Sequence, residues 1–332
     1  MSAPPPEPAA LDPQQVAERA DAVLAEVATA VVDMRSTLRI ALAAILADGH
    51  VLFEDLPGLG KTLAARSLST ALGLQFRRVQ CTPDLLPSDI TGSAVWDPQA
   101  TEFRFRPGPV FTGLLLADEI NRTAPKTQSA LLESMAERQV TVDGVTHPLP
   151  RPFHVVATSN PVEYEGTYPL PEAQLDRFMV RIAAGHPSVD AEVAILTRRL
   201  ERRREEATVR QVVDAPALLA MQAGVEAVPV DPDVVRYCVA LAGATRSHPA
   251  VEVGASPRGS QALLLVARAL AVIDGRGFVT PEDVKEVAVA TLAHRITLTP
   301  ASWAGGMQPD EVVRQALTRV AGPAAVRRPV RG

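Results

Sequence analysis

The spacing of apolar residues changes between helical and strand-like patterns several times over the first 185 residues. Residues 12–15 (DPQQ) combine a capping aspartate, a proline at the first helical position and a capping-box glutamine, and apolar residues at helical spacing follow as far as Val31. Further helices are expected over residues 38–46 and after Lys61. Short apolar runs predict strands at residues 51–54, 74–79, 114–117, 153–158 and 178–183. Strands separated by helices are typical of an α/β fold with a mostly parallel sheet.

The pattern changes after Gly185, where the strand-like runs stop. Three segments begin with helix-capping residues, at Ser188, Asp231 and Thr280. The sequence therefore predicts an α/β core over residues 11–184, which includes the N-terminal helix, and a helical domain over residues 185–325. The Pro-rich residues 1–10 are expected to form a disordered tail, and residues 326–332 a frayed one.

Composition narrows the class of protein. Of the 332 residues, 47% are hydrophobic and 21% charged, as in globular proteins with a real core. Cys81 and Cys238 are the two cysteines, and they lie too far apart for a disulfide scaffold or a usual structural zinc site, so a reducing cytoplasm is the expected compartment. No apolar run is long enough to cross a bilayer, which argues against membrane insertion. The net charge of −5 argues against nucleic acid as a partner.

Candidate chemistry begins at the glycine-rich stretch LPGLGKT, residues 56–62, between a predicted strand and a predicted helix. Such a loop turns backbone N–H groups toward a phosphate, the lysine reaches the β- and γ-phosphates, and the Thr62 hydroxyl binds Mg²⁺. The full pattern has glycine where this chain has Asp55, and a glycine-rich turn without a ligand stays an alternative. The expected ATP-binding residues are Pro57, Gly58, Leu59, Gly60, Lys61, Thr62 and Leu63.

Two further strands end in polar side chains suited to hydrolysis. The apolar run 114–117 is followed by Asp118, expected to hold Mg²⁺ through a water molecule, and by Glu119, expected to orient and deprotonate the attacking water. The strand at 153–158 leads to Asn160, which is suited to hydrogen bonds with the γ-phosphate and that water. Taken alone, the two carboxylates are equally typical of a helix N-cap, and Asn160 before a proline is typical of a turn.

Four stretches resemble, in order and spacing, the MoxR family of AAA+ ATPases, in its helix-2-insert branch. They are EDLPGLGKTLAA, TPDLLPSDITGSAVWD, FRFRPGPVFTGLLLADEINRTAPKTQSALLESMAERQVTVDG and VVATSNPVEYEGTYPLPEAQLDRF. The resemblance is dense from Gly49 to Ile182 and thinner beyond. It implies an αβα P-loop core with a five-stranded parallel sheet, a C-terminal helical lid, and ring-shaped oligomers, usually hexamers, with ATP at the protomer interface.

The resemblance also assigns roles to matching residues. It implies that Lys61 and Thr62 belong to Walker A, Asp118 and Glu119 to Walker B, and Asn160 to sensor 1.

Two arginines complete this set. Arg177 matches the arginine finger, which reaches the neighbouring subunit's γ-phosphate, although an Asp–Arg surface pair is an alternative. Arg258 matches sensor 2, in cis or in trans. Arg258 is expected in the first turn of a helix that starts at Ser256-Pro257, where the helix dipole disfavours a cation. A bound anion would explain a cation at this place, and an exposed arginine with a small energetic cost is the alternative.

Two hairpins are predicted around turn residues 97–100 and 143–144, and the resemblance assigns them to the helix-2 insert and to a hairpin before sensor 1. Trp96 is the expected partner contact, whereas Phe103 and Phe105 are expected to pack. Residues 32–34 (VDM) align with the family's base-pocket segment but differ from it.

The resemblance implies a Mg²⁺-dependent ATPase that remodels or matures client protein complexes, often metalloenzymes, commonly with a partner that carries a von Willebrand factor A domain. Three other functions stay open at this point: an ATPase subunit of a chelatase-type complex, an ATP-gated scaffold with little turnover, and a nucleic-acid translocase.

Overall fold

The computed structural model describes residues 9–161, 166–203 and 207–323. Of the two predicted tails, only residues 9 and 10 lie within these ranges, and the other tail residues lie outside them. In chain order the elements are α1 (Pro13–Ala28), α2 (Arg35–Leu46), β1 (Val51–Glu54), α3 (Lys61–Ala71), β2 (Phe76–Gln80), α4 (Pro87–Thr91), β3 (Gly92–Asp97), β4 (Glu102–Pro107), β5 (Leu114–Asp118), η1 (Ile120–Arg122), α5 (Pro125–Glu137), β6 (Gln139–Val142), β7 (Val145–Pro148), β8 (His154–Ser159), α6 (Glu172–Leu175), β9 (Val180–Ile182), α7 (Val189–Arg202), α8 (Ala215–Ala227), α9 (Pro232–Arg246), β10 (Val251–Val253), α10 (Pro257–Ile273), α11 (Pro281–Leu292), η2 (Ala293–Arg295), β11 (Thr297–Leu298), α12 (Pro300–Ala304) and α13 (Pro309–Arg319).

The predicted helix starts are found where the capping pattern indicates them. Asp12 Oδ1 accepts a 2.9 Å hydrogen bond from the Gln15 N–H, and Gln15 Oε1 accepts one from the Asp12 N–H, which completes the capping box of α1. Ser188, Asp231 and Thr280 likewise accept from backbone N–H groups in the first turns of α7, α9 and α11. Local sequence thus fixes where these helices begin.

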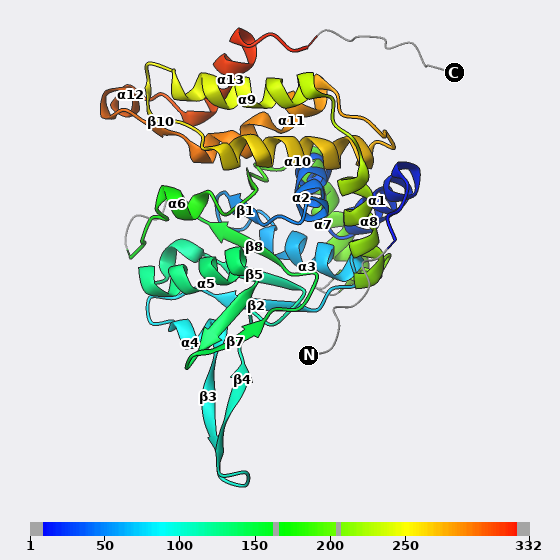
Figure 1. The fold of residues 1–332 in the computed structure, drawn as a ribbon. Helices are drawn as coiled ribbons and strands as arrows, with labels where there is room; N and C mark the ends of the chain where they lie inside the picture. The colour runs from blue at the N-terminus through cyan, green and yellow to red at the C-terminus, as the bar shows by residue number, and fades with distance from the viewer. Residues whose placement is uncertain (1–8, 162–165, 204–206, 324–332) are drawn as a thin grey trace.

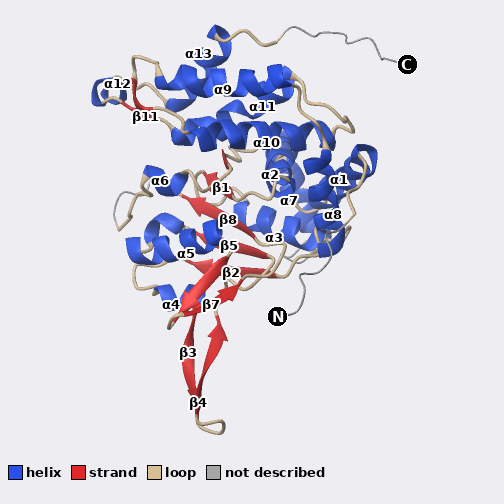
Figure 2. Ribbon diagram, in the orientation of Figure 1, coloured by secondary structure: helices blue, strands red, loops and turns tan. Residues whose placement is uncertain are grey.

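Five parallel strands form the central sheet, in the order β2-β5-β8-β1-β9 (Figures 1 and 2). This confirms the predicted α/β fold. The strand predicted from residue 74 starts two residues later, because the Leu74 N–H donates to the Ser69 carbonyl and still closes the end of α3.

Helices cover both faces of the sheet. All five residues of β5 are buried, and the side chains of its four apolar residues alternate between two hydrophobic clusters. Leu114 and Leu116 face the cluster that contains residues of α1, α2 and α3, whereas Leu115 and Ala117 face the one that contains residues of α5. The carboxyl ends of β1, β5 and β8 therefore meet at one edge of a rigid three-layer core.

The C-terminal helices lie beside α2 and β1 in Figure 1, and the buried helix α10 is the one drawn nearest to α2 and β1. α10 packs against α9 and α11 and also against α1 and α2, so one apolar cluster runs from the N-terminal helices into the C-terminal ones. The helical domain predicted after Gly185 also contains one short antiparallel strand pair, β10 and β11, which the sequence pattern did not indicate. These strands have only three and two residues, too few to produce a periodic pattern. No described helix is long and apolar enough to cross a membrane.

Both predicted hairpins form, as β3–β4 and β6–β7. The first projects away from the body of the molecule (Figure 1). Phe105 packs as expected, stacked on His147 and edge-on to Phe111. The expectation for Phe103 is wrong: it is 71% exposed and its ring lies edge-on to that of Trp96, because this part of the hairpin extends beyond the core.

Candidate active site

The loop between β1 and α3 is shaped by two glycines. Gly58 and Gly60 have φ angles of +83° and +80°, in the left-handed region that favours glycine. A Cβ built on either residue meets no atom within 4 Å, so the loop borders open space. Because α3 begins at Lys61, the unpaired N–H groups of its first turn lie at this space and suit an anion.

Lys61 lies at the entrance of α3 and is only 9% exposed. Its ammonium group donates a 2.5 Å hydrogen bond to the Asp55 carbonyl. Burial lowers the pKa of Lys61, while the charges of Asp55, Asp118 and Glu119 oppose that shift. The charge of a buried cation that has carboxylates nearby can be stabilised further by a bound phosphate.

Asp55 stands where the full loop pattern has glycine, and its side chain organises the loop. Its carboxylate accepts a 2.8 Å hydrogen bond from the Leu56 N–H and a 2.6 Å bond from the Gly185 N–H. The departure from the pattern therefore ties the start of the loop to the segment that follows β9.

Asp118 ends β5 and is 8% exposed. Its Oδ1 accepts a 2.6 Å hydrogen bond from the Thr158 hydroxyl, and its Oδ2 lies 3.4 Å from the Thr62 hydroxyl. Arg78 also contacts Oδ2, at 2.6 Å from Nη2. Thr62 and Asp118 thus converge, as the metal assignment requires.

Glu119 follows Asp118 with a left-handed φ of +58°, which is uncommon for a residue other than glycine. Its N–H donates a 2.8 Å hydrogen bond to the Thr158 hydroxyl, so one hydroxyl holds both acidic residues. The Glu119 carboxylate accepts from Gln80 Nε2 at 2.9 Å and pairs with Arg122 at 3.3 Å.

Asn160 follows β8 and is 4% exposed, and its backbone carbonyl accepts a hydrogen bond from Asn121 Nδ2. It lines the same cavity as the glycine-rich loop and the two acidic residues. That cavity has a volume of about 310 Å³, and its walls include Gly60, Lys61, Thr62, Asp118, Glu119 and Asn160.

A second cavity of about 480 Å³ adjoins the first, because Gly58, Gly60 and Leu63 line both. Residues 32–34, which align with the base-pocket segment, line it, and α7 supplies the apolar side chains Ile195 and Leu196. Its mostly apolar wall beside a phosphate-type loop suits a nucleoside. The departure from the family's segment therefore leaves a pocket in place.

Arg177 and Arg258 do not lie in either cavity. They share a separate one of about 290 Å³ with Arg138, Arg295 and residues 48–50, which precede β1. The glycine-rich loop follows β1, so the two arginines lie toward the opposite end of this strand.

The alternatives for these arginines can be compared with their contacts. Asp176 pairs with Arg295 at 2.6 Å, whereas Arg177 donates to the Leu132 carbonyl, so the expected alternative of an Asp176–Arg177 surface pair is not observed. Arg258 is exposed in the first turn of α10, and no described residue forms an ion pair with it. Its charge, after the larger effect of burial, lowers the pKa of Arg295.

Sequence reasoning missed three residues of the site: Arg78, Gln80 and Thr158. Arg78 lies within the strand predicted over residues 74–79 from its apolar residues, and Gln80 directly follows that predicted strand, so neither residue stood out by type. Thr158 is an ordinary strand residue by type, and only its contacts with Asp118 and Glu119 distinguish it.

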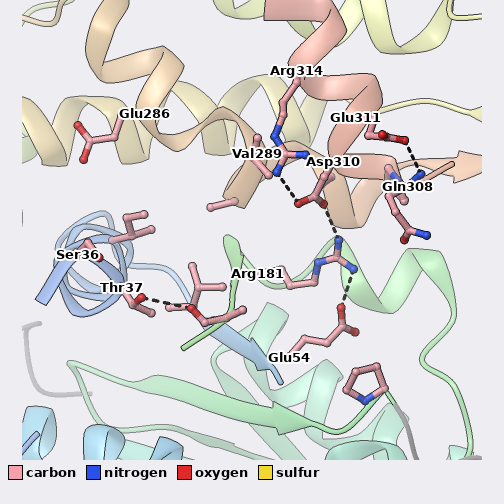
Figure 3. A pocket seen from close by; sticks show the side chains of 17 residues that line it. Ser36, Thr37, Glu54, Arg181, Glu286, Val289, Gln308, Asp310, Glu311 and Arg314 are labelled. Atoms are coloured by element: carbon pink, nitrogen blue, oxygen red, sulfur yellow. Dashed lines mark hydrogen bonds and ion pairs between the residues drawn. The ribbon is translucent and has the colours of Figure 1, made fainter. Parts of the chain in front are cut away.

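A further cavity, of about 760 Å³, lies elsewhere, between the sheet and helices α11 and α13 (Figure 3). Arg181 of β9 crosses it, paired with Glu54 at 2.8 Å and with Asp310 of α13 at 3.5 Å. Glu54 directly precedes the phosphate-type loop. The cavity therefore marks a polar junction between the core and the C-terminal helices.

The oxygen ligands present suit magnesium carried by a nucleotide. Thr62 and Asp118 offer a hydroxyl and a carboxylate on one cavity wall, which is the hard oxygen chemistry that Mg²⁺ prefers. Among the described ranges, no cluster of three or more His, Cys, Asp or Glu side chains is arranged to hold a metal. Phosphate oxygens would have to supply other ligands.

Comparison with known proteins gives two family matches. Residues 50–180 match the ATPase family associated with various cellular activities (AAA), and residues 243–316 match the AAA lid domain.

Individual relatives extend these matches over most of the chain. The uncharacterized protein YeaC of Bacillus subtilis is 47% identical, over 88% of this chain and 91% of its own length. Chaperone MoxR1 of Mycobacterium tuberculosis is 42% identical over 85% and 76%, and protein MoxR of Paracoccus denitrificans is 33% identical over 80% and 84%. A solved structure of a candidate ATPase from Cytophaga hutchinsonii superposes with a TM-score of 0.87 at 37% identity, covering 94% of this chain and 97% of that one. The chain belongs to the AAA ATPases, in the MoxR family.

Proposed function

We propose that this chain is a Mg²⁺-dependent ATP hydrolase that acts as a chaperone-like ring ATPase on client protein complexes. The observation that carries the proposal is the convergence of Lys61, Thr62, Asp118, Glu119 and Asn160 on one cavity at the carboxyl edge of a parallel sheet. An adjoining apolar pocket has room for the adenosine. The carboxyl edge of the strands is where ligands bind in open α/β sheets.

Each residue has a distinct task in this mechanism. The loop N–H groups and Lys61 bind the β- and γ-phosphates, and Thr62 and Asp118 would hold Mg²⁺, which when bound offsets phosphate charge. Glu119 accepts a proton from the attacking water, and Asn160 orients that water against the γ-phosphate. Thr158 keeps Asp118 and Glu119 in place through its two hydrogen bonds.

The site is completed by a second copy of the chain. In space, Arg177 and Arg258 lie near the start of β1, whereas the glycine-rich loop follows its end. Because a strand rises about 3.3 Å per residue, the length of β1 keeps the two arginines too far from the loop to contact the same phosphate within one subunit. A head-to-tail arrangement would bring both arginines of one subunit to the neighbour's cavity. Heterologous contacts of this kind form rings when the rotation between subunits closes, and we propose a hexamer.

Helix α7 offers a surface for that neighbour. Val189, Val193, Leu196 and Leu200 lie along one side of the helix and are 58–78% exposed. Because Leu196 also lines the apolar nucleotide pocket, a subunit covering this stripe would stand at the mouth of the site.

The biological role follows by analogy with the relative named Chaperone MoxR1. We propose that hydrolysis in the cytoplasm drives the maturation of client complexes, often metalloenzymes, with a partner that carries a von Willebrand factor A domain. Residues 11–184 would form the ATPase core and residues 185–325 the moving helical lid. A chelatase-type complex would instead be indicated by copurification with a larger subunit of that type.

Mixing two inactive variants tests the proposal directly. Lys61→Ala removes the phosphate contact and Arg177→Ala the finger, so each variant alone should lose nearly all ATP turnover. If the arginine acts across the interface, a 1:1 mixture joins an intact loop to an intact arginine at one interface in four, and recovers about a quarter of the wild-type rate. Mixing Lys61→Ala with Glu119→Gln is the matched control, because both changes lie in the same subunit's cavity.

The outcomes separate the possible functions. No recovery in the first mixture, with subunits shown to exchange, contradicts a site completed in trans. ATP binding without turnover at any concentration of the wild-type chain favours a scaffold that assembles around nucleotide.

A further inference from the structure

One oxygen of Asp118 already holds a cation. Arg78 approaches Oδ2 with two nitrogens, Nε at 3.0 Å and Nη2 at 2.6 Å. The same oxygen lies 3.4 Å from the Thr62 hydroxyl, while Oδ1 is occupied by Thr158. Arg78 therefore occupies the oxygen of Asp118 that faces the other residue assigned to the metal.

The two members of this ion pair differ in exposure. The Asp118 side chain is 11% exposed and the Arg78 side chain 49%. Arg78 can withdraw into water with little desolvation to reverse, whereas Asp118 is fixed by the end of β5 and by Thr158. The pair is thus built so that the arginine, and not the carboxylate, is exchangeable.

Arg78 also connects Asp118 to Glu119. Its Nη2 donates a 2.7 Å hydrogen bond to Gln80 Oε1, and Gln80 Nε2 donates a 2.9 Å bond to Glu119 Oε2. In the register of β2 on β5, Gln80 lies opposite Asp118 and Arg78 opposite Leu116, so alternation puts both side chains on one face. A single chain of contacts therefore joins the two acidic residues.

We propose that Arg78 is a displaceable counter-cation, which neutralises Asp118 until a divalent ion binds and must leave Oδ2 when it does. Two cations at one carboxylate oxygen repel each other, and the repulsion is strong beside a buried side chain. On leaving, Arg78 gives up its bond to Gln80, which then holds Glu119 less firmly. Metal binding is in this way coupled to a looser hold on the general base, which keeps its contact with Arg122. The inference rests on the proposed ATPase function and makes Arg78 a positioning residue in it.

Manganese binding tests the inference without relying on turnover. The probe is Mn²⁺ in the presence of the non-hydrolysable analogue AMPPNP, with free Mn²⁺ measured by electron paramagnetic resonance. Arg78→Gln should bind Mn²⁺ about tenfold more tightly than the wild type, because the competing charge is gone. Arg78→Lys keeps the charge and should stay near the wild type. Arg77→Gln is the matched control, since Arg77 is exposed on the opposite face of the same strand.

Each result decides between the ideas. A gain in affinity cannot come from structural damage, so it supports the competition. Unchanged or weaker Mn²⁺ binding in Arg78→Gln, with tight binding in the wild type, overturns the inference and leaves the ATPase proposal standing. Absence of AMPPNP-dependent Mn²⁺ binding in the wild type overturns both.

A second variant tests the link between Arg78 and Gln80, on which the coupling to Glu119 depends. Gln80→Leu should loosen Arg78 and so tighten Mn²⁺ binding in the wild-type background, but should add nothing once Arg78 is Gln. Equal gains in the two backgrounds would show that Gln80 acts independently of Arg78 and would overturn the coupling.

Discussion

Thr158 is the residue through which the acidic pair can be perturbed most cleanly. Its hydroxyl donates to Asp118 Oδ1 at 2.6 Å and accepts from the Glu119 N–H at 2.8 Å, and the side chain is 1% exposed. Thr158→Val replaces the hydroxyl by a methyl group of similar size and keeps the strand-forming branched shape. The change therefore removes two buried hydrogen bonds with little loss of packing.

The expected loss of stability follows from what each partner is left without. A hydrogen bond to a charged group contributes about 1.5–3 kcal/mol, and a buried N–H without a partner costs about 1–3 kcal/mol. Asp118 keeps Arg78 and Thr62 as neighbours, which limits its share. We expect the free energy of unfolding to fall by about 3 kcal/mol, a large part of the roughly 5–15 kcal/mol available to a typical protein.

Turnover should fall more than nucleotide affinity. Glu119 is held at a φ of +58°, which costs an L-residue about 1 kcal/mol, and the bond from its N–H to Thr158 offsets this cost. Without that bond the Glu119 backbone can relax and move the general base, so kcat should drop by about 10². Lys61 and the glycine-rich loop are untouched, so ATP binding should persist.

Urea unfolding and steady-state ATP hydrolysis measure the two effects, with Thr158→Ser as the control because it keeps the hydroxyl. The serine variant should stay close to the wild type in both assays. If Thr158→Val matches the wild type in unfolding free energy within about 0.5 kcal/mol, the two hydrogen bonds do not contribute as argued.

Two more predictions address acid stability and assembly. Burial lowers the pKa of His50 and His294 well below the ordinary 6.5, so these side chains are neutral when folded. Below pH 6.5 the unfolded chain binds protons at these histidines that the folded chain does not. The free energy of unfolding should therefore fall by up to about 1.4 kcal/mol per pH unit for each histidine. Equal urea midpoints at pH 7.5 and 5.5 would contradict this prediction. Leu200→Ser on the exposed stripe of α7 should weaken self-association, as measured by sedimentation velocity. Val239→Ser on α9 is the control, because Val239 is also exposed. Identical sedimentation of Leu200→Ser and the wild type would show that α7 is not part of the interface.

Local sequence was sufficient wherever a structural feature depends on neighbours along the chain. The capping box at Asp12 and the glycine-rich loop before Lys61 were predicted because a few adjacent residues determine both backbone and hydrogen bonds. The buried strand before Asp118 was predicted from its apolar run for the same reason.

Contacts between distant strands were not predictable in this way. Alternation along β2 places Arg78 and Gln80 on one face, but only the strand order tells that this face borders the end of β5. The same order brings Thr158 beside Asp118. A single sequence carries no local signal for which strands are neighbours, so the residues that hold the acidic pair were found only from the structure. The exposed Phe103 was misjudged because how far a hairpin projects from the core is also a long-range property.

The positions of Arg177 and Arg258 show how local and long-range information combine. The cation in the first turn of α10 predicts an anion nearby, but it does not tell which subunit binds that anion. In the structure, Asp176 accepts from Arg295 at 2.6 Å through Oδ1 and from the Ser256 hydroxyl at 3.2 Å through Oδ2. Ser256 caps the helix that carries Arg258, and Asp176 directly precedes Arg177. One carboxylate thus links the segments that bear both arginines, so they would approach a neighbouring subunit's nucleotide as a unit. In the proposed ring, movement of α10 would then shift both cations together and would couple the position of the C-terminal helices to hydrolysis in the next subunit.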